Sequence, residues 1–205
     1  MKIVVFGATG GTGRETVTQG LAAGHHVTAV VRRPDALPAA PRLQIAVLPD
    51  LNNVEQVHGV VDGRDAVISA LGTNARGPVS VCTDGVRSIL VAMTRTGVRR
   101  LIVVSAHGAA ESNDGSFYTR SLWAMLGHKM RDKDEMEKLI RASDVDWTIV
   151  RPPALTRKPR TGHYHVGTDL KIRLTSTISR ADLADFLLRE ATTPNYTHQA
   201  PRIAV

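Results

Sequence analysis

The sequence predicts an α/β fold in which helices cover both faces of a doubly wound parallel sheet, in a single domain over residues 1–205. Short β-branched runs alternate with amphipathic segments along most of the chain, which is the pattern of a parallel sheet with helical crossovers. A glycine-rich loop follows the first apolar run and opens the next segment. The length of 205 residues and the apolar content of 42% fit one ordinary globular domain.

The first expected unit is a strand, a helix and a second strand. Lys2 to Phe6 is a β-branched run that ends in glycine, as a buried strand does. Arg14 to Ala23 places Val17 and Leu21 one helical turn apart, which predicts a helix. His26 to Val31 repeats the strand pattern.

The middle of the chain continues this alternation. Strands are predicted over Leu43 to Leu48 and over Ala66 to Leu71, with a short helix over Val54 to Val60 between them. A longer helix over Val79 to Thr96 stops at a glycine and leads to the strand Leu101 to Ser105.

The last part of the chain is less regular. Lys129 to Ala142 predicts a charged amphipathic helix, and Trp147 to Val150 predicts a strand closed by two prolines. We expect Ala106 to Trp123 to be a long loop, and Tyr164 to Leu174 to hold an extra pair of strands. Ser179 to Glu190 predicts a helix with a serine N-cap and an acid in its first turn. We expect the C-terminal third of the chain to form the substrate pocket.

Charge and composition disfavour several kinds of protein. The formal net charge is +7, but the basic residues are scattered and only 4% of residues are aromatic, which disfavours nucleic-acid binding. A basic surface instead suits a phosphate-bearing cofactor and an anionic substrate. Cys82 is the single cysteine, which excludes an internal disulfide and fits a reducing compartment. With no signal-peptide pattern and no apolar stretch of membrane-spanning length, we expect a cytoplasmic protein without a membrane partner.

The loop Gly7-Ala-Thr-Gly-Gly-Thr-Gly13 predicts a Rossmann-type dinucleotide site. Gly7 allows the tight turn after the strand, Gly10 lets backbone N–H groups approach a pyrophosphate, and Gly13 lets the helix pack close to the strand. The N-terminus of the helix then faces the phosphate charge. The alternative is a structural turn without a ligand, and the strand–turn–helix context argues against it.

The end of the second strand favours NADP(H) over NAD(H). NAD-specific sites usually hold the ribose hydroxyls there with an acid, but this strand ends in Arg32-Arg33 and the next acid is Asp35. A guanidinium can bind the 2′-phosphate of NADP, which a carboxylate would repel. The alternative is a pair of solvated surface arginines.

Further strand ends converge on the same edge of the sheet, where ligands of open α/β sheets bind. Asp50 could accept a hydrogen bond from the adenine amino group, or could be an ordinary turn residue, and Leu51 could pack on the ring. Gly72 and Thr73 are small enough for the backbone to pass a ribose. Pro152, after the last strand, is expected to contact the cofactor at this edge.

Four segments carry a resemblance to a known family: the glycine loop, the Val31-Arg32 strand end, Leu71-Gly72-Thr73, and Trp147 to Pro153 (WTIVRPP). They resemble the atypical short-chain dehydrogenases of the NAD(P)H-binding, NmrA-like group, and within it the biliverdin-IXβ and flavin reductases, from Met1 to about Tyr196. The resemblance implies hydride transfer from NADPH to flavins or linear tetrapyrroles. It also implies a cofactor site made of Gly7, Thr9, Gly10, Thr12, Arg32, Asp50, Leu51, Gly72 and Thr73.

Two departures from these reductases leave the substrate open. Ala154 stands where they have a histidine, and Ser105-Ala106 where they have Thr-Ser. The usual short-chain dehydrogenase acid, a tyrosine one helical turn before a lysine, is also missing: Leu122 follows Tyr118 at that spacing. Reduction of a conjugated acceptor is therefore favoured over reduction of a ketone, because a delocalised product needs less acid assistance.

Three side chains are candidates for catalysis. Ser105 could bond the cofactor carboxamide or the substrate, or be a satisfied strand-end hydroxyl. Lys133 could hold the nicotinamide ribose, or lie on a solvated helix face. His107 could donate a proton, or be a bystander in a loop. We expect a pocket lined by Ser105 to His107, Pro152 to Ala154 and Tyr164, and no metal site, because the histidines lack ligand spacing.

These observations favour an NADPH-dependent reductase of flavins, quinones or tetrapyrrole-like acceptors. The expected partner is that small-molecule acceptor, and the expected assembly is a monomer or small homo-oligomer. The alternatives are a redox-sensing regulator that binds NADP without turning it over, and an epimerase-like enzyme that uses tightly bound NAD.

Overall fold

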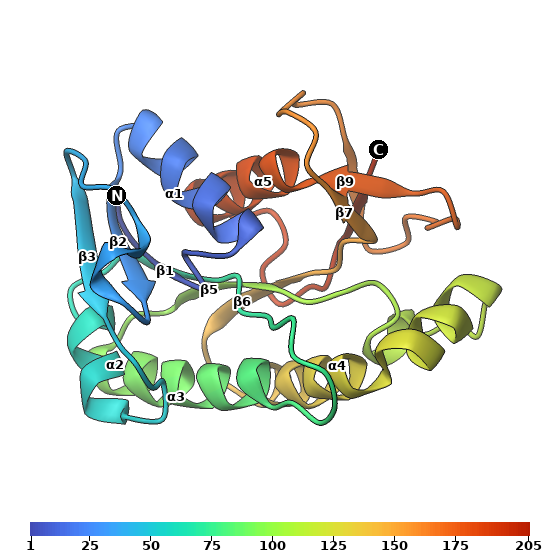
Figure 1. The fold of residues 1–205 in the computed structure, drawn as a ribbon, viewed down its shortest axis with the longest axis horizontal. Coiled ribbons are helices and arrows are strands. Elements are labelled where there is room, and N and C mark those ends of the chain that lie inside the picture. The colour runs from blue at the N-terminus through green and yellow to red at the C-terminus, as the bar shows by residue number, and fades with distance from the viewer.

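The structure is a computed structural model that describes residues 1–205. Its centre is a six-stranded parallel sheet with the strand order β3-β2-β1-β4-β5-β6 (Figure 1). The strands are β1 (Lys2–Phe6), β2 (His26–Val31), β3 (Leu43–Val47), β4 (Ala66–Ser69), β5 (Arg100–Val104) and β6 (Asp146–Val150). The predicted doubly wound parallel sheet of Rossmann type is confirmed, and each predicted strand of this sheet is present.

Helices cover both faces of the sheet (Figure 1). One face carries α1 (Gly11–Ala22) and α5 (Arg180–Thr192), and the other carries α2 (Val54–Val61), α3 (Val81–Thr96) and α4 (Phe117–Arg141). The inner strands are buried on both sides, as their apolar sequences require, whereas the edge strand β3 is only partly covered. Two separate apolar cores result, one of 21 buried residues under α2, α3 and α4, and one of 19 under α1 and α5.

The strand order reverses between β1 and β4. The first strands proceed from β1 outward to β3, and the chain then returns to place β4 on the other side of β1. Loops on either side of such a switch point diverge and leave a crevice at the carboxyl ends of the strands. The glycine loop after β1 therefore lies at the crevice that the topology creates.

Helix α4 differs most from the prediction. The prediction of a loop over Ala106 to Trp123 is wrong for the second half of that range, because helix α4 begins at Phe117. The Ser116 side chain caps this end by accepting a hydrogen bond from the Thr119 backbone N–H. Leu126 has non-helical dihedral angles (φ −128°, ψ 22°) and divides α4 into two segments. The first segment points away from the body of the molecule (Figure 1).

Two small sheets complete the C-terminal part. β7 (Ala154–Thr156) pairs with β9 (Thr177–Ser179) in parallel, and β8 (His165–Gly167) pairs with β10 (Arg202–Ala204) in antiparallel orientation. The strand pair expected within Tyr164 to Leu174 is therefore a single strand, whose partner is the end of the chain. None of the helices is both long and apolar enough to cross a membrane.

Candidate functional site

The glycine loop has the shape of an anion cradle. Gly7 has a left-handed backbone (φ 74°), and a Cβ there would lie 2.5 Å from the carbonyl oxygen of Ala70. A Cβ on Gly13 would collide with the carbonyl oxygen of Gly7, so this glycine lets α1 pack against β1. A Cβ on Gly10 would meet only the Gly7 carbonyl oxygen, at 3.3 Å, and would otherwise project into open space. The loop thus leaves room beside its backbone for a pyrophosphate.

A hollow of about 650 Å³ runs from this loop along the carboxyl ends of β1 to β4. Most of the residues predicted to bind the cofactor line this hollow. Those lining it are Gly7, Thr9, Gly10, Arg32, Asp50, Leu51, Gly72 and Thr73. Thr12 and Gly13 lie behind it in the first turn of α1, and Arg33 stands outside it on the exposed segment after β2.

Arg32 and Asp50 are both exposed in this hollow. Arg32 forms no ion pair with an acid, so its guanidinium is available to a ligand. The Asp50 carboxylate accepts a hydrogen bond of 2.9 Å from the Asn52 backbone N–H. Asp50 therefore shapes a turn, and one of its oxygens is already engaged.

Arg14 is a further basic residue at the glycine loop, outside the predicted site. Its Nε donates to the Thr9 carbonyl at 3.0 Å, and its Nη2 donates to the Ala36 carbonyl at 3.0 Å. It thereby ties the glycine loop to the segment that follows Arg32 and Arg33. Its position directly after the third glycine of the loop is the sequence signal that could have assigned Arg14 to the site.

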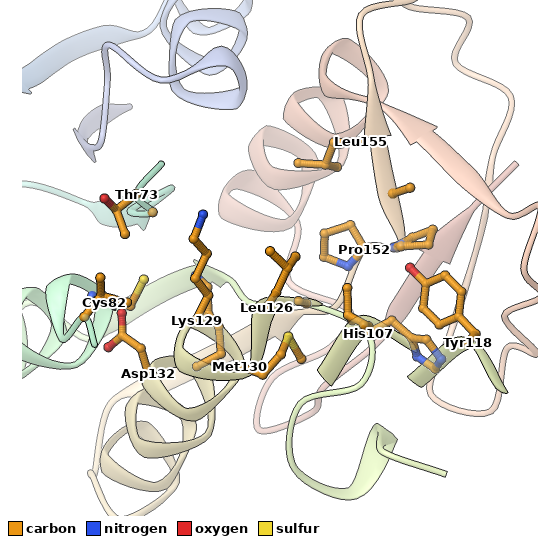
Figure 2. A pocket seen from close by; sticks show the side chains of 17 residues that line it. Thr73, Cys82, His107, Tyr118, Leu126, Lys129, Met130, Asp132, Pro152 and Leu155 are labelled. Atoms are coloured by element: carbon orange, nitrogen blue, oxygen red, sulfur yellow. Dashed lines mark hydrogen bonds between the residues drawn. The ribbon is translucent and has the colours of Figure 1, made fainter. Parts of the chain in front are cut away.

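A second hollow, of about 380 Å³, continues from the first. The two share Gly72 and Thr73, so one extended ligand can occupy both. Figure 2 shows Thr73 and Cys82 at one end and His107, Tyr118 and Pro152 at the other. Leu126, Lys129 and Met130 of α4 lie between these ends (Figure 2). The lining is largely apolar, as expected of a pocket for an aromatic or conjugated ligand.

The C-terminal third contributes less to this pocket than predicted. It supplies the segment from Pro152 to Leu155, whereas α4 supplies Tyr118, Leu122, Leu126 and residues of the next turns. The reason is the early start of α4, which places a helix where a loop was expected. Tyr118, Leu122 and Leu126 follow one another at one-turn spacing, and this pattern could have revealed the helix.

Lys133 lies inside the pocket at the ends of two strands. Its Nζ donates to the Val104 carbonyl at 2.6 Å and to the Leu71 carbonyl at 3.1 Å. The carboxylate of the neighbouring Asp132 accepts from the backbone N–H groups of Cys82 and Thr83 at the start of α3. Lys133 is therefore held by backbone oxygens, and it makes no ion pair.

His107 is the most unusual polar group in the pocket. The residue is 1% exposed, and neither ring nitrogen has a hydrogen-bond partner. Burial, with a further contribution from the charge of Arg202, lowers the pKa of His107 to about 4. The imidazole is therefore neutral near pH 7 and presents one donor and one acceptor without partners. Buried polar groups are almost always paired, so the ring nitrogens of His107 are free to bond polar atoms of a molecule in the pocket.

Tyr118 lies beside His107, with ring centroids 5.5 Å apart (Figure 2). Burial raises the pKa of the Tyr118 phenol, which keeps its proton. The phenol thus adds a hydrogen-bond donor beside the His107 imidazole at this end of the pocket. The sequence pattern around Tyr118 shows only that a Tyr-Lys pair is absent and gives no signal for this position beside His107.

Two residues predicted to line the pocket do not. The Ser105 hydroxyl donates to Glu137 Oε1 at 2.5 Å, on the side of β5 that α4 covers. The Tyr164 hydroxyl donates to Asp185 Oδ2 at 2.7 Å and belongs to the contact between the β8 region and α5. The expectation that Ser105 and Tyr164 line the pocket is therefore wrong, because buried carboxylates engage both hydroxyls elsewhere.

Comparisons with known proteins agree with this geometry. The sequence profile of the family described as NAD(P)H-binding matches residues 7–194. The UPF0659 protein YMR090W of Saccharomyces cerevisiae is 28% identical over 96% of this chain and 89% of its own length. The uncharacterized sugar epimerase YhfK of Bacillus subtilis is 29% identical over 98% of this chain and 92% of its own length.

Two solved structures share the fold across nearly the whole chain. The oxidoreductase ylbE of Lactococcus lactis superimposes with a TM-score of 0.86 at 19% identity, over 99% of this chain and 90% of its own. ChuY of Escherichia coli O157:H7, described as an anaerobilin reductase, superimposes with a TM-score of 0.83 at 23% identity, over 99% of this chain and 96% of its own.

Proposed function

Because the chain belongs to the NAD(P)H-binding family and is an atypical short-chain-dehydrogenase-like protein, we propose that it is an NADPH-dependent reductase of conjugated acceptors. The acceptor class is flavins, quinones or linear tetrapyrroles. One observation carries the proposal: an apolar pocket that holds the unpartnered neutral His107 is continuous with the glycine-loop hollow. A flat, mostly apolar ligand with a few polar edge atoms suits such a pocket.

The cofactor proposed is NADP(H) rather than NAD(H). Arg32 offers an unpaired guanidinium at the end of β2, where an NAD site would carry an acid. Arg14 adds a second positive charge at the start of α1, next to the same segment. Both arginines favour a ligand with an additional phosphate.

The residues of the pocket have distinct proposed roles. When bound, the cofactor supplies a hydride, and the chain orients and shields the reacting partners. Lys133 is placed to bond a ribose hydroxyl, since its ammonium group lies where the two hollows meet. Pro152 and Leu126 provide apolar surface that excludes water from the pocket. His107 and Tyr118 offer hydrogen bonds to polar atoms of the acceptor.

The known relatives support a reductase more than an epimerase. ChuY, with the same fold, is described as a reductase, and the pocket suits a conjugated molecule better than a sugar, whose hydroxyls need many polar partners. An epimerase-like enzyme is one alternative, because the relative YhfK is described as a sugar epimerase. A redox sensor that binds NADP without turning it over is the other alternative. For the assembly, we expect a monomer or small homo-oligomer, without nucleic-acid or membrane partners.

The test is NADPH oxidation with a panel of acceptors. Purified protein is mixed with NADPH and, in turn, riboflavin, FMN, a benzoquinone and biliverdin, and loss of NADPH absorbance is followed against the reaction without protein. We expect saturable oxidation with at least one acceptor. NADPH binding measured by calorimetry, without oxidation by any acceptor, would favour the sensor. Epimerisation of a nucleotide sugar by protein purified with bound NAD would contradict the proposal.

A further inference from the structure

Arg180 reaches from the far end of the chain to the glycine loop. It is the first residue of α5, which lies beside α1 on the same face of the sheet (Figure 1). A Cβ on Gly11 would lie 2.5 Å from Arg180 Cδ and 2.6 Å from Arg180 Nε. The arginine side chain therefore lies directly against the loop backbone at the N-terminus of α1. This contact also explains the glycine at position 11, whose backbone is not left-handed.

The guanidinium has no acidic partner. Arg180 forms no ion pair, and its recorded hydrogen bonds run from Nη1 to the Thr156 carbonyl at 3.1 Å and to the Leu155 carbonyl at 3.5 Å. A guanidinium carries five N–H donors, so those on Nε and Nη2 are without protein partners. Arg180 is half-buried, so these donors face the space beside the glycine loop without an acidic partner.

The position of Arg180 also opposes the dipole of its own helix. The N-terminus of α5 carries a partial positive charge, which disfavours a cation in the first turn. The same holds for the N-terminus of α1, against which the side chain packs. Two helix N-termini and a guanidinium thus converge at one place. The acid in the first turn of α5, Asp182, does not pair with Arg180, because its carboxylate accepts hydrogen bonds from Ser179, Thr161 and Gly162. A bound anion would remove this repulsion.

We propose that Arg180 binds the pyrophosphate of the nicotinamide cofactor. The inference rests on the proposed placement of the cofactor along the glycine loop, and it concerns a residue outside the predicted site. Arg180 stands between the loop and β7, and Leu155 of β7 lines the second hollow. Arg180 thus bridges the glycine loop, at Gly11, and strand β7, and it lines neither hollow itself. Arg32 recognises the adenosine end, whereas Arg180 recognises the part that NADP and NAD share.

The test compares ligands that contain or lack the pyrophosphate. Dissociation constants are measured by calorimetry for NADP⁺, NAD⁺ and 2′-AMP with wild type, Arg180→Ala and Arg32→Ala. Arg180→Ala should weaken NADP⁺ and NAD⁺ by a similar factor, about tenfold or more, because a charge-assisted contact is lost. It should leave 2′-AMP unchanged. Arg32→Ala should show the opposite pattern, weakening NADP⁺ and 2′-AMP but not NAD⁺.

A second pair of variants tests the contact itself. Gly11→Ala should displace the Arg180 side chain and weaken NADP⁺ in the wild-type background. In the Arg180→Ala background, where the colliding atoms are absent, Gly11→Ala should have little further effect. The matched control is Arg189→Ala, which removes an exposed arginine from the other end of α5. It should leave all three affinities unchanged.

Each outcome has a defined meaning, provided that thermal unfolding shows every variant to be folded. NADP⁺ binding to Arg180→Ala with wild-type affinity would overturn the role of Arg180. Equal weakening of 2′-AMP and NADP⁺ by Arg180→Ala would overturn the assignment to the pyrophosphate. If the wild-type protein binds none of the three ligands, the proposed function is contradicted. This outcome is separate from the test of Arg180, because it is seen without any variant.

Discussion

Ser105 and Glu137 form a short hydrogen bond of 2.5 Å between Oγ and Oε1, in the interior behind the pocket. Glu137 is buried and forms an ion pair with the buried Arg151, whose Nε donates to Glu137 Oε1 at 3.1 Å. Arg151 also reaches Glu111, whose pKa is lowered to about 2, chiefly by this hydrogen bond. The Ser105 hydroxyl therefore belongs to a buried network that joins β5, β6 and α4.

Ser105→Ala should affect stability more than catalysis. The variant leaves a buried carboxylate with one hydrogen bond fewer, which should lower the free energy of unfolding by about 1–3 kcal/mol. The kcat/KM should fall by about tenfold or less, because the hydroxyl does not face the pocket. Chemical denaturation and steady-state kinetics measure the two effects. Ser105→Thr, which keeps the hydroxyl, is the control. A larger kinetic loss with unchanged stability would restore Ser105 as a direct contact of the reactants.

His107 should make stability depend on pH. The pKa is about 4 in the folded protein, against 6.5 for an ordinary histidine, so the unfolded state binds more protons between these values. The contribution of His107 is fully present above pH 6.5 and is lost as the pH falls toward 4, by up to about 3 kcal/mol. Melting temperatures of wild type and His107→Gln should therefore converge on acidification. Parallel curves across this window would contradict the buried, neutral state.

Arg32→Ala should remove the preference for NADP(H). The guanidinium is unpaired in the protein, so its loss costs binding energy without breaking an internal ion pair. NADPH affinity should fall by roughly 1.5–3 kcal/mol, while NADH affinity stays near its wild-type value. Calorimetric titration of both cofactors measures this. Arg33→Ala serves as the control, because Arg33 lies outside the hollow. Equal affinities of the wild-type protein for the two cofactors would contradict the assignment.

Gly10→Val should abolish cofactor binding while the protein stays folded. The position has ordinary backbone angles (φ −70°, ψ 164°) and open space at its Cβ, so a valine meets little of the protein itself. Its branches would instead fill the room that a pyrophosphate needs. Circular dichroism and cofactor titration are the measurements. Gly59→Val, in the short helix α2 away from the loop, is a comparison with open space at Cβ. A folded Gly10→Val protein that still binds NADPH would show that the phosphate lies elsewhere.

The central sheet could be predicted because most of its strands are apolar on both faces and end at glycine, proline or a polar residue. β7 and β9 could not, because strands of three residues carry too little pattern. The start of α4 depends on a local cap by Ser116, in a stretch whose polar residues also suit a loop.

The cofactor crevice could be predicted for a similar reason. Its residues follow successive strands, and the topology brings strand ends together. Contacts between side chains that are distant in sequence could not be predicted. The alternation of residues along a β-strand shows which side chains are buried, but not which residue each of them contacts. Ser105 meets Glu137 from 32 positions away, and Arg180 meets Gly11 from the opposite end of the chain.

The last prediction concerns proton donation in the pocket. Tyr118 and His107 lie together at one end of the pocket (Figure 2), and neither forms part of a Tyr-Lys pair. If the acceptor is a flavin or similar molecule, its reduced form delocalises charge, and water can supply the proton. Tyr118→Phe and His107→Ala should then each lower kcat/KM by about tenfold or less. Phe117→Ala, at a neighbouring residue whose side chain is 76% exposed, is the control and should have no effect. Essential general acids contribute on the order of 10²–10⁴ in rate. A loss of that size in Tyr118→Phe, with NADPH affinity unchanged, would identify the phenol as a general acid and indicate a carbonyl substrate.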